Sequence, residues 1–468
     1  MKLANLFAAQ DMTTGKPMSR LLQFSIPLLI GNLAQQMYNT VDSIVVGQFV
    51  GDNALAAVGA SGPVLNLLLV LFMGISSGCG IMVSQYFGAK DRDNLSHTVG
   101  TALTLITIAS AIIMVAGPLL TGPLMSLLDT PVEIYGMSCS YLTIIFVGII
   151  GTAFYNIVSG MLRGLGDSFT PLLFLLLACG LNIVLDLLFV IAFDWKVDGV
   201  AWATIIAQAV SGVLCLIRLF RMHDVLDIKP SILKPRKALV LQTIKLGLPA
   251  GLTQAIFSLA SIVVQALINT FGTIVITCAI VVMRVDGFAM MPNFTYGAAM
   301  ITYTGQNVGA GKLGRVKKGA KAGLTLGLCT SIVLVIALMF FGKYLMMLFT
   351  NTPEVINMGV HMMQILAVGY VAVSVTQVLC GVMSGSGDTV TPMLISLTTT
   401  VAIRVPLAYF IAELTKTAEL PTGSEDCIFI SLLVSWVLGA VLSFLFYKFG
   451  GWHKKAEAFA KPETVDAE

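Results

Sequence analysis

Five ionisable side chains lie inside long apolar segments of the sequence, where a charge is costly to bury. Residues of this kind often bind ions, relay protons or contact polar ligands. The alternative role is an internal ion pair or a polar contact that holds helices together. The five are Asp42, Asp186, Asp286, Arg284 and Arg404. Each is therefore a candidate functional residue.

Asp42 ends a polar stripe in the first apolar segment. Gln35, Tyr38 and Asn39 precede it by seven, four and three residues, which places all four side chains on one face of a helix. Polar side chains gathered on one face of an apolar helix favour a functional role over simple packing. We expect this face to line a binding site.

A second acid, Asp186, lies four residues after Asn182 and shares its helix face. Thr204, in the next apolar segment, adds a hydroxyl, although a lone threonine more often bonds its own helix backbone. With Asp42, these residues would form a small cation site from two carboxylates, an amide and a hydroxyl. A proton needs one carboxylate and Na+ needs several oxygens, so either ion fits. We expect no other metal and no cofactor.

Pro27 lies in the same segment as Asp42 and removes one backbone hydrogen bond from that helix. It is a candidate conformational hinge. The alternative is a static bend, which a matching proline at position 249 favours.

The remaining charges lie in the second half of the sequence. Arg284 and Asp286 are two residues apart, on largely opposite helix faces, so they need not pair with each other. Asp286 could instead neutralise Arg404. We favour a structural role for this set, and its function stays open.

The segments that carry these residues are typical of an integral membrane protein. Hydrophobic residues make up 57% of the chain and charged residues 11%, with a mean hydropathy of +0.90, which excludes a soluble fold. A helix needs about 20 apolar residues to cross a bilayer. Twelve segments qualify: 20–47, 54–84, 96–121, 132–161, 170–193, 199–220, 241–270, 274–304, 316–345, 354–384, 391–414 and 427–449. We predict an all-α fold of twelve transmembrane helices.

Basic residues indicate the orientation, because they concentrate in cytoplasmic loops. Of 27 Lys and Arg residues, 22 lie in the termini and in the loops that follow even-numbered segments, and three lie in the opposite loops. Both termini should be cytoplasmic, in the inner membrane of a prokaryote.

The chain contains an internal repeat at an offset of 221 residues. Residues 160–171 recur as residues 381–392 with six identities in twelve positions. This predicts a first lobe at 1–221, a cytoplasmic linker at 222–240, a second lobe at 241–450 and a cytoplasmic tail at 451–468. Six spans per copy predict two six-helix lobes related by a pseudo-two-fold axis along the membrane normal. The counterparts of Asp42, Asn182 and Asp186 in the second copy are apolar, so the repeat fold itself does not require them.

Enzyme signatures are few in the sequence: the four histidines are far apart and the eight cysteines occur singly. We therefore expect no catalytic residues and no enzymatic activity. The expected partners are small-molecule substrates and the lipid bilayer, with no nucleic acid, and we expect a monomer.

Over all twelve segments the chain resembles the multidrug and toxic compound extrusion (MATE) family. The features that carry the resemblance are the first segment from Pro27 to Asp42, the repeated Gln-x-x-Gly-Ala pieces at 85–89 and 306–310, and the doubled turn at 160–171 and 381–392. The set Asp42, Asn182, Asp186 and Thr204 looks like the cation site of the branch named for a DNA-damage-inducible exporter (DinF-like).

The resemblance implies an antiporter that expels drug-like, often cationic or amphipathic molecules by alternating access, driven by inward H+ or Na+. It assigns protonation of Asp42 and bending at Pro27 to cargo release. It also places Tyr38, Tyr141 and Asn156 in the first-lobe substrate cavity, to which the polar stripe adds Gln35 and Asn39. The alternative is a lipid-linked precursor flippase of the same superfamily, although such proteins tend to present more basic residues than Arg284 and Arg404 to their cavity.

Overall fold

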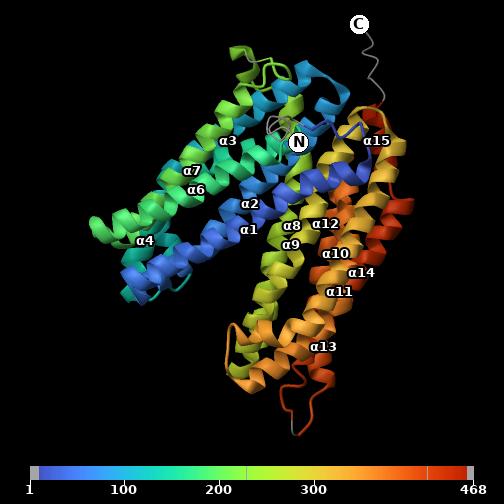
Figure 1. Cartoon of the computed structure of the whole chain (residues 1–468). Helices are drawn as coiled ribbons and strands as arrows, with labels where there is room; N and C mark the ends of the chain where they lie inside the picture. The colour runs from blue at the N-terminus through green and yellow to red at the C-terminus, as the bar shows by residue number, and fades with distance from the viewer. Residues whose placement is uncertain (1–9, 228, 419, 461–468) are drawn as a thin grey trace. The chain divides into compact units, whose positions relative to one another are not determined.

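The computed structural model describes residues 10–227, 229–418 and 420–460, except for the side chains of Asn39 and Leu71. All regular elements in these ranges are helical (Figure 1). The first half contains α1 (Pro17–Val45), η2 (Val46–Val50), α2 (Asp52–Ala89), α3 (Arg92–Leu127), α4 (Val132–Val147), α5 (Ile149–Gly164), α6 (Phe169–Leu187), η3 (Leu188–Ala192) and α7 (Lys196–Phe220). The second half contains η4 (Pro230–Leu233), α8 (Lys237–Asn269), α9 (Thr273–Gly309), α10 (Leu313–Met347), α11 (Pro353–Gly385), α12 (Val390–Ser396), η5 (Leu397–Arg404), α13 (Val405–Leu414), α14 (Asp426–Phe449) and α15 (Trp452–Ala460).

The predicted all-helical membrane architecture is confirmed. Each of the twelve predicted segments coincides with a helix or with consecutive helical pieces. Ten helices are long and apolar enough to span a bilayer, and α4 with α5, bent by 52°, would form an eleventh span. Within the described residues α1 falls short of that criterion, because its polar stripe lowers its hydropathy.

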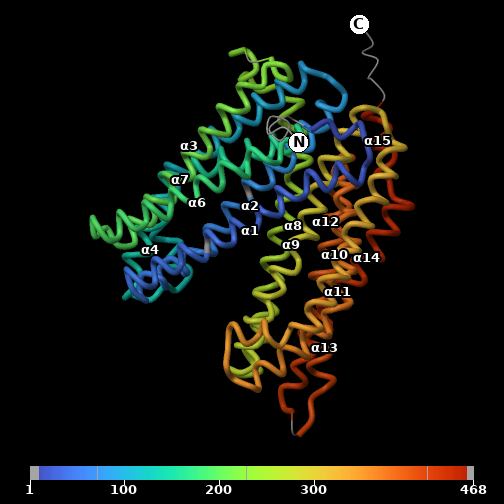
Figure 2. The backbone as a smooth tube through the Cα atoms, in the orientation of Figure 1, coloured from blue at the N-terminus to red at the C-terminus, as the bar shows by residue number. Residues whose placement is uncertain are grey.

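The chain forms two compact units. The first holds residues 23–251 with residues 10–12, and the second holds residues 13–22 and the chain from 252 onward. In the first unit α5 packs against α2 and α7. In the second unit α11 packs against α9 and α14 in the corresponding way (Figure 2). Each unit has its own apolar core. The lobe boundaries at 221 and 241 rest on the repeat and stay a prediction.

The doubled turn begins the fifth span of each repeat in the same way. Asp167 accepts hydrogen bonds from the backbone N–H (2.9 Å) and the hydroxyl (2.7 Å) of Thr170 at the start of α6. Asp388 does the same for Thr391 at 3.4 and 2.7 Å. Each carboxylate satisfies helix N–H groups that have no partner within the helix. The glycines before these acids, at 166 and 387, have φ of 87° and 93°, a conformation that favours glycine.

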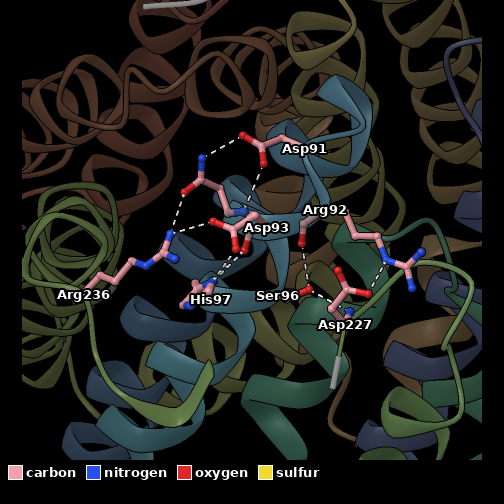
Figure 3. Close-up of polar contacts among 8 residues, drawn as sticks. Asp91, Arg92, Asp93, Ser96, His97, Asp227 and Arg236 are labelled. Atoms are coloured by element: carbon pink, nitrogen blue, oxygen red, sulfur yellow. Dashed lines mark hydrogen bonds and ion pairs between the residues drawn. The ribbon is translucent and has the colours of Figure 1, made fainter. Parts of the chain in front are cut away.

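The predicted linker docks on the first turns of α3, as Figure 3 shows. Arg92 pairs with Asp227 at 2.9 Å, and Arg236 pairs with Asp93 at 2.8 Å. The backbone N–H of Asp227 also donates to the hydroxyl of Ser96 at 2.9 Å. This connection is therefore held against the first unit along much of its length.

Candidate functional site

The polar residues of the first lobe come together from four spans. Tyr38 and Asp42 lie one turn apart on α1, Tyr141 lies on α4 and Asp186 lies near the end of α6. Tyr38 interacts electrostatically with Asp42, Tyr141 and Asp186, and Thr204 of α7 lies beside its hydroxyl. We call Tyr38, Asp42, Tyr141, Asn182, Asp186 and Thr204 the first-lobe cluster.

The two acids of the first-lobe cluster interact directly. The carboxyl groups of Asp42 and Asp186 are close electrostatic neighbours. Asn182 lies one turn before Asp186, and neither residue has any exposed surface. Two carboxylates at one buried position repel each other when both are ionised, so the site favours an added positive charge.

The cluster also contains unsatisfied polar atoms. Among the described residues, six of its buried atoms lack a well-formed hydrogen bond: the Tyr38 hydroxyl, Asp42 Oδ1, both amide atoms of Asn182 and both carboxyl oxygens of Asp186. Buried polar atoms are ordinarily paired, so such a group calls for an ion, a proton or water. The oxygens present suit H+ or Na+. In the described part of the chain, no group of three or more His, Cys, Asp or Glu side chains is arranged to hold a metal ion.

Both acids lie next to π-helical turns. α1 passes into η2 four residues after Asp42, and α6 passes into η3 two residues after Asp186. π-helical turns inside helices are frequent at functional sites, because they change the helix hydrogen-bond pattern locally. The sequence carries no recognised signal for such turns, and our sequence analysis did not predict them.

The other residues predicted for the first-lobe site are not part of the first-lobe cluster. The side-chain amide of Asn156 donates to the backbone carbonyl of Thr152 in its own helix at 2.8 Å. The backbone carbonyl of Asn156 accepts a hydrogen bond from the hydroxyl of Ser76 on α2 at 2.8 Å. Gln35 is half-buried on α1, and the Asn39 side chain lies outside the described part. α1 continues as a helix through Pro27. The substrate-cavity and hinge assignments stay predictions.

A second polar group lies inside the second lobe. Asp286 of α9 interacts electrostatically with Arg404, the last residue of η5, and lies beside the hydroxyl of Tyr370 on α11. Arg404 is 6% exposed and Tyr370 is fully buried, whereas Arg284 is exposed. We call Asp286, Tyr370 and Arg404 the second-lobe cluster. Sequence reasoning missed Tyr370, although it follows Gly369, the repeat counterpart of Gly148.

Two helical repeats, one of which holds two neighbouring carboxylates inside apolar spans, are typical of a membrane transport protein. The chain belongs to the MatE family, whose profile matches residues 27–188 and 249–410, one stretch in each repeat. It is thus a multi-pass member of the MATE multidrug efflux transporter family.

The relatives cover nearly the whole chain. A Bacillus subtilis protein named "Probable multidrug resistance protein YpnP" is 29% identical over 446 residues, which is 95% of this chain and 98% of that protein. A Thermotoga maritima protein named "Probable multidrug resistance protein NorM" is 22% identical over 93% of each chain.

Solved structures share the fold. An outward-facing multidrug resistance MATE transporter of the MOP superfamily has a TM-score of 0.87 at 22% identity and covers 96% of this chain and 98% of its own. A MATE structure described as being in the bent conformation has a TM-score of 0.88 at 22% identity, with the same coverage.

Proposed function

We propose that this transporter is a secondary active efflux antiporter of the DinF-like branch. It exports drug-like, often cationic or amphipathic molecules in exchange for H+ or Na+ by alternating access. The observation that carries the proposal is the first-lobe cluster, in which the fully buried Asp186 lies beside the partly buried Asp42, with unsatisfied oxygens on both. The likeness to proteins named for multidrug resistance supports the cargo class.

The charge balance of the cluster gives a coupling mechanism. With both carboxylates ionised, the site lowers its free energy by binding a proton, Na+ or a cationic cargo. Cargo and coupling ion then oppose each other's binding, and this effect is reciprocal. In this mechanism Asp42 and Asp186 hold the ion, while Asn182 and Thr204 supply neutral oxygens.

α1 would carry the conformational response. Pro27 cannot donate a hydrogen bond to Gln23, and η2 follows Asp42, so α1 has a weak point on either side of the acid. A change of charge at Asp42 would favour one helix shape over another. MATE structures with the same fold are described as being in a straight and in a bent conformation.

We further propose that the protein works as a monomer in the bacterial inner membrane with both termini in the cytoplasm. The loop distribution of Lys and Arg supports this orientation. Its partners would be small-molecule substrates and lipid.

Dye efflux from proteoliposomes tests the proposal. Ethidium export would be measured under an imposed H+ gradient and, separately, an imposed Na+ gradient, for the native chain and for Asp42→Asn and Asp186→Asn. Asp52→Asn is the matched control, because Asp52 is exposed at the start of α2, outside the cluster. We expect one of the two gradients to drive export by the native protein and by Asp52→Asn. Neither gradient should drive export by Asp42→Asn or Asp186→Asn. Equal export without a gradient, or normal export by Asp42→Asn, would contradict the proposal and make lipid flipping the next activity to test.

A further inference from the structure

Three lysines near the start of α10 have no role in the proposed coupling mechanism. They are Lys317, Lys318 and Lys321, and all three are exposed. Their ammonium groups pair with no carboxylate among the described residues, and α10 itself contains no acidic residue. We call these three residues the α10 lysine patch. It is a concentrated positive charge without an internal counter-charge.

The α10 lysine patch lies on a face of the helix that does not pack against the rest of the second unit. The packed side of α10 carries small residues such as Gly319 and Gly323, which are buried. Beyond the lysines, the outer side continues through the exposed residues Val333, Ile336 and Phe340. Of the ten spanning helices, α10 has the smallest buried share in its apolar window, 17%. In a membrane this outer side therefore faces lipid.

The spacing of charges along α10 places the patch at the level of the lipid headgroups. Residues 322–342, between Lys321 and Lys343, carry no charge. At the rise of an α-helix this stretch is about 32 Å long, close to the roughly 30 Å of a hydrocarbon core. Lys317 and Lys318 lie within about 6 Å of Lys321 along the helix axis, and a headgroup layer is roughly 5–8 Å thick. All three lysines therefore fall in that layer.

The first lobe covers the corresponding surface with its own chain. At the repeat offset the three lysines correspond to Ser96, His97 and Gly100 of α3. There the Ser96 hydroxyl accepts the backbone N–H of Asp227 at 2.9 Å, and a Cβ at Gly100 would lie 2.1 Å from the Ile232 carbonyl oxygen. In the second unit the segment that follows the last span, α15, packs against α9 instead. The docked connection of the first lobe thus has no equivalent over the α10 lysine patch.

We propose that the α10 lysine patch binds the headgroups of anionic phospholipids. Three positive charges in the headgroup layer attract a headgroup with a net negative charge, whose acyl chains then lie along the apolar outer side of α10. A zwitterionic headgroup carries its own positive charge and gains less. Only the leaflet rests on the proposed function: with cytoplasmic termini, the patch faces the cytoplasmic leaflet.

Native mass spectrometry of the purified full-length chain tests the proposal. The chain would be titrated in neutral detergent with phosphatidylglycerol, which is anionic, and separately with phosphatidylcholine, which is zwitterionic. We expect the native chain to bind phosphatidylglycerol at least about tenfold more tightly, and this preference to fall as the salt concentration rises. Lys317→Gln/Lys318→Gln/Lys321→Gln should lose the preference and keep its affinity for phosphatidylcholine.

Two further variants serve as controls. Lys317→Arg/Lys318→Arg/Lys321→Arg keeps the charge and should keep the preference. Lys229→Gln/Lys234→Gln/Lys454→Gln removes the same charge from exposed positions outside the spanning helices and should also keep it. The proposal is overturned if the native chain binds both lipids equally, or if this control loses as much affinity as the glutamine variant of the patch.

Inorganic phosphate distinguishes a lipid site from a site for a free anion. We expect phosphate to leave bound phosphatidylglycerol in place at the lipid's own concentration, because phosphate has no acyl chains to lie along α10. Displacement of the lipid by phosphate under those conditions would overturn the proposal. No part of this test measures transport, so failure of the antiport proposal and failure of the lipid proposal are separate results.

Discussion

The two lobes share a packing scheme but differ in how their buried charges are balanced. α5 and α11 occupy corresponding places against their neighbours, and the capped turns at Asp167 and Asp388 begin corresponding helices. The shared features therefore belong to the fold. The first-lobe cluster has two acids and unsatisfied oxygens, whereas the second-lobe cluster has one acid with Arg404 as an electrostatic neighbour. We therefore expect the first-lobe cluster, with its two acids, to be a position that binds a mobile cation.

Neutralising each cluster in turn tests that difference most strongly. Asp42→Asn/Asp186→Asn should reduce gradient-driven ethidium efflux to the leak of protein-free liposomes, because no carboxylate remains to exchange an ion. Asp286→Asn/Arg404→Met should keep efflux within about fivefold of the native rate, since replacing both partners of a buried pair is often close to neutral. Loss of efflux in the second double variant would show that both lobes take part in coupling.

The fold could be predicted from sequence largely because it depends on local patterns. Apolar runs located the helices, and the doubled turn revealed the repeat. α1 shows the limit of hydropathy, because the polar stripe that makes it functionally interesting also lowers its apolar character. The place where the compact units divide, inside α8 at residues 251 and 252, depends on tertiary packing that has no sequence signature.

The candidate site was predictable in residue type but not in arrangement. Helical spacing placed Asn182 and Asp186 on one face, but it could not bring Asp42 of α1 against α6. That neighbour relation is a long-range contact. Tyr370 was missed because a single tyrosine in an apolar helix has no distinguishing pattern.

Gly148 and Gly369 provide a second comparison. Gly148 lies at the bend between α4 and α5, whereas Gly369 lies inside the continuous helix α11. A Cβ at Gly148 would lie 2.4 Å from the branched side chain of Ile205, close to the α7 backbone, whereas one at Gly369 would meet the Trp436 ring edge at 2.4 Å. A ring can tilt more easily than a β-branched side chain can move. We expect Gly148→Ala to destabilise the protein by about 2 kcal/mol and Gly369→Ala by less. Thermal unfolding of both purified variants measures this, and the reverse order would contradict the comparison.

The capped turns allow a third comparison, with a smaller effect. Asp167 is buried and holds the Thr170 N–H at 2.9 Å, and Arg218 of α7 pairs with it at 3.4 Å. Asp388 holds the corresponding N–H at 3.4 Å, and its partner at 2.8 Å is Lys455 of α15. Loss of a helix cap costs about 1 kcal/mol. Asp167→Ala should lower the free energy of unfolding by about 1 kcal/mol or somewhat more. Asp388→Ala should lower it by less.

Proteolysis distinguishes the two cap variants further. Because Lys455 ties α15 to Asp388, the tail beyond α14 should be cut faster in Asp388→Ala than in Asp167→Ala. Equal cutting rates would mean that Trp452, which is 2% exposed, holds α15 in place without the ion pair.

The connection docked on α3 should give the smallest effect. Arg236 pairs with Asp93 at 2.8 Å, but their side chains are 43% and 66% exposed, so water screens the pair. We expect Arg236→Ala to change the stability of the protein by about 0.5 kcal/mol and to leave ethidium efflux unchanged. Gly100→Ala is the informative contrast, because its Cβ would lie 2.1 Å from the Ile232 carbonyl oxygen and would push the connection off α3. If Gly100→Ala transports normally while it unfolds at a lower temperature, the docked connection stabilises the first unit without taking part in transport. A loss of efflux without a loss of stability would instead extend the functional difference between the lobes to the segment that joins them.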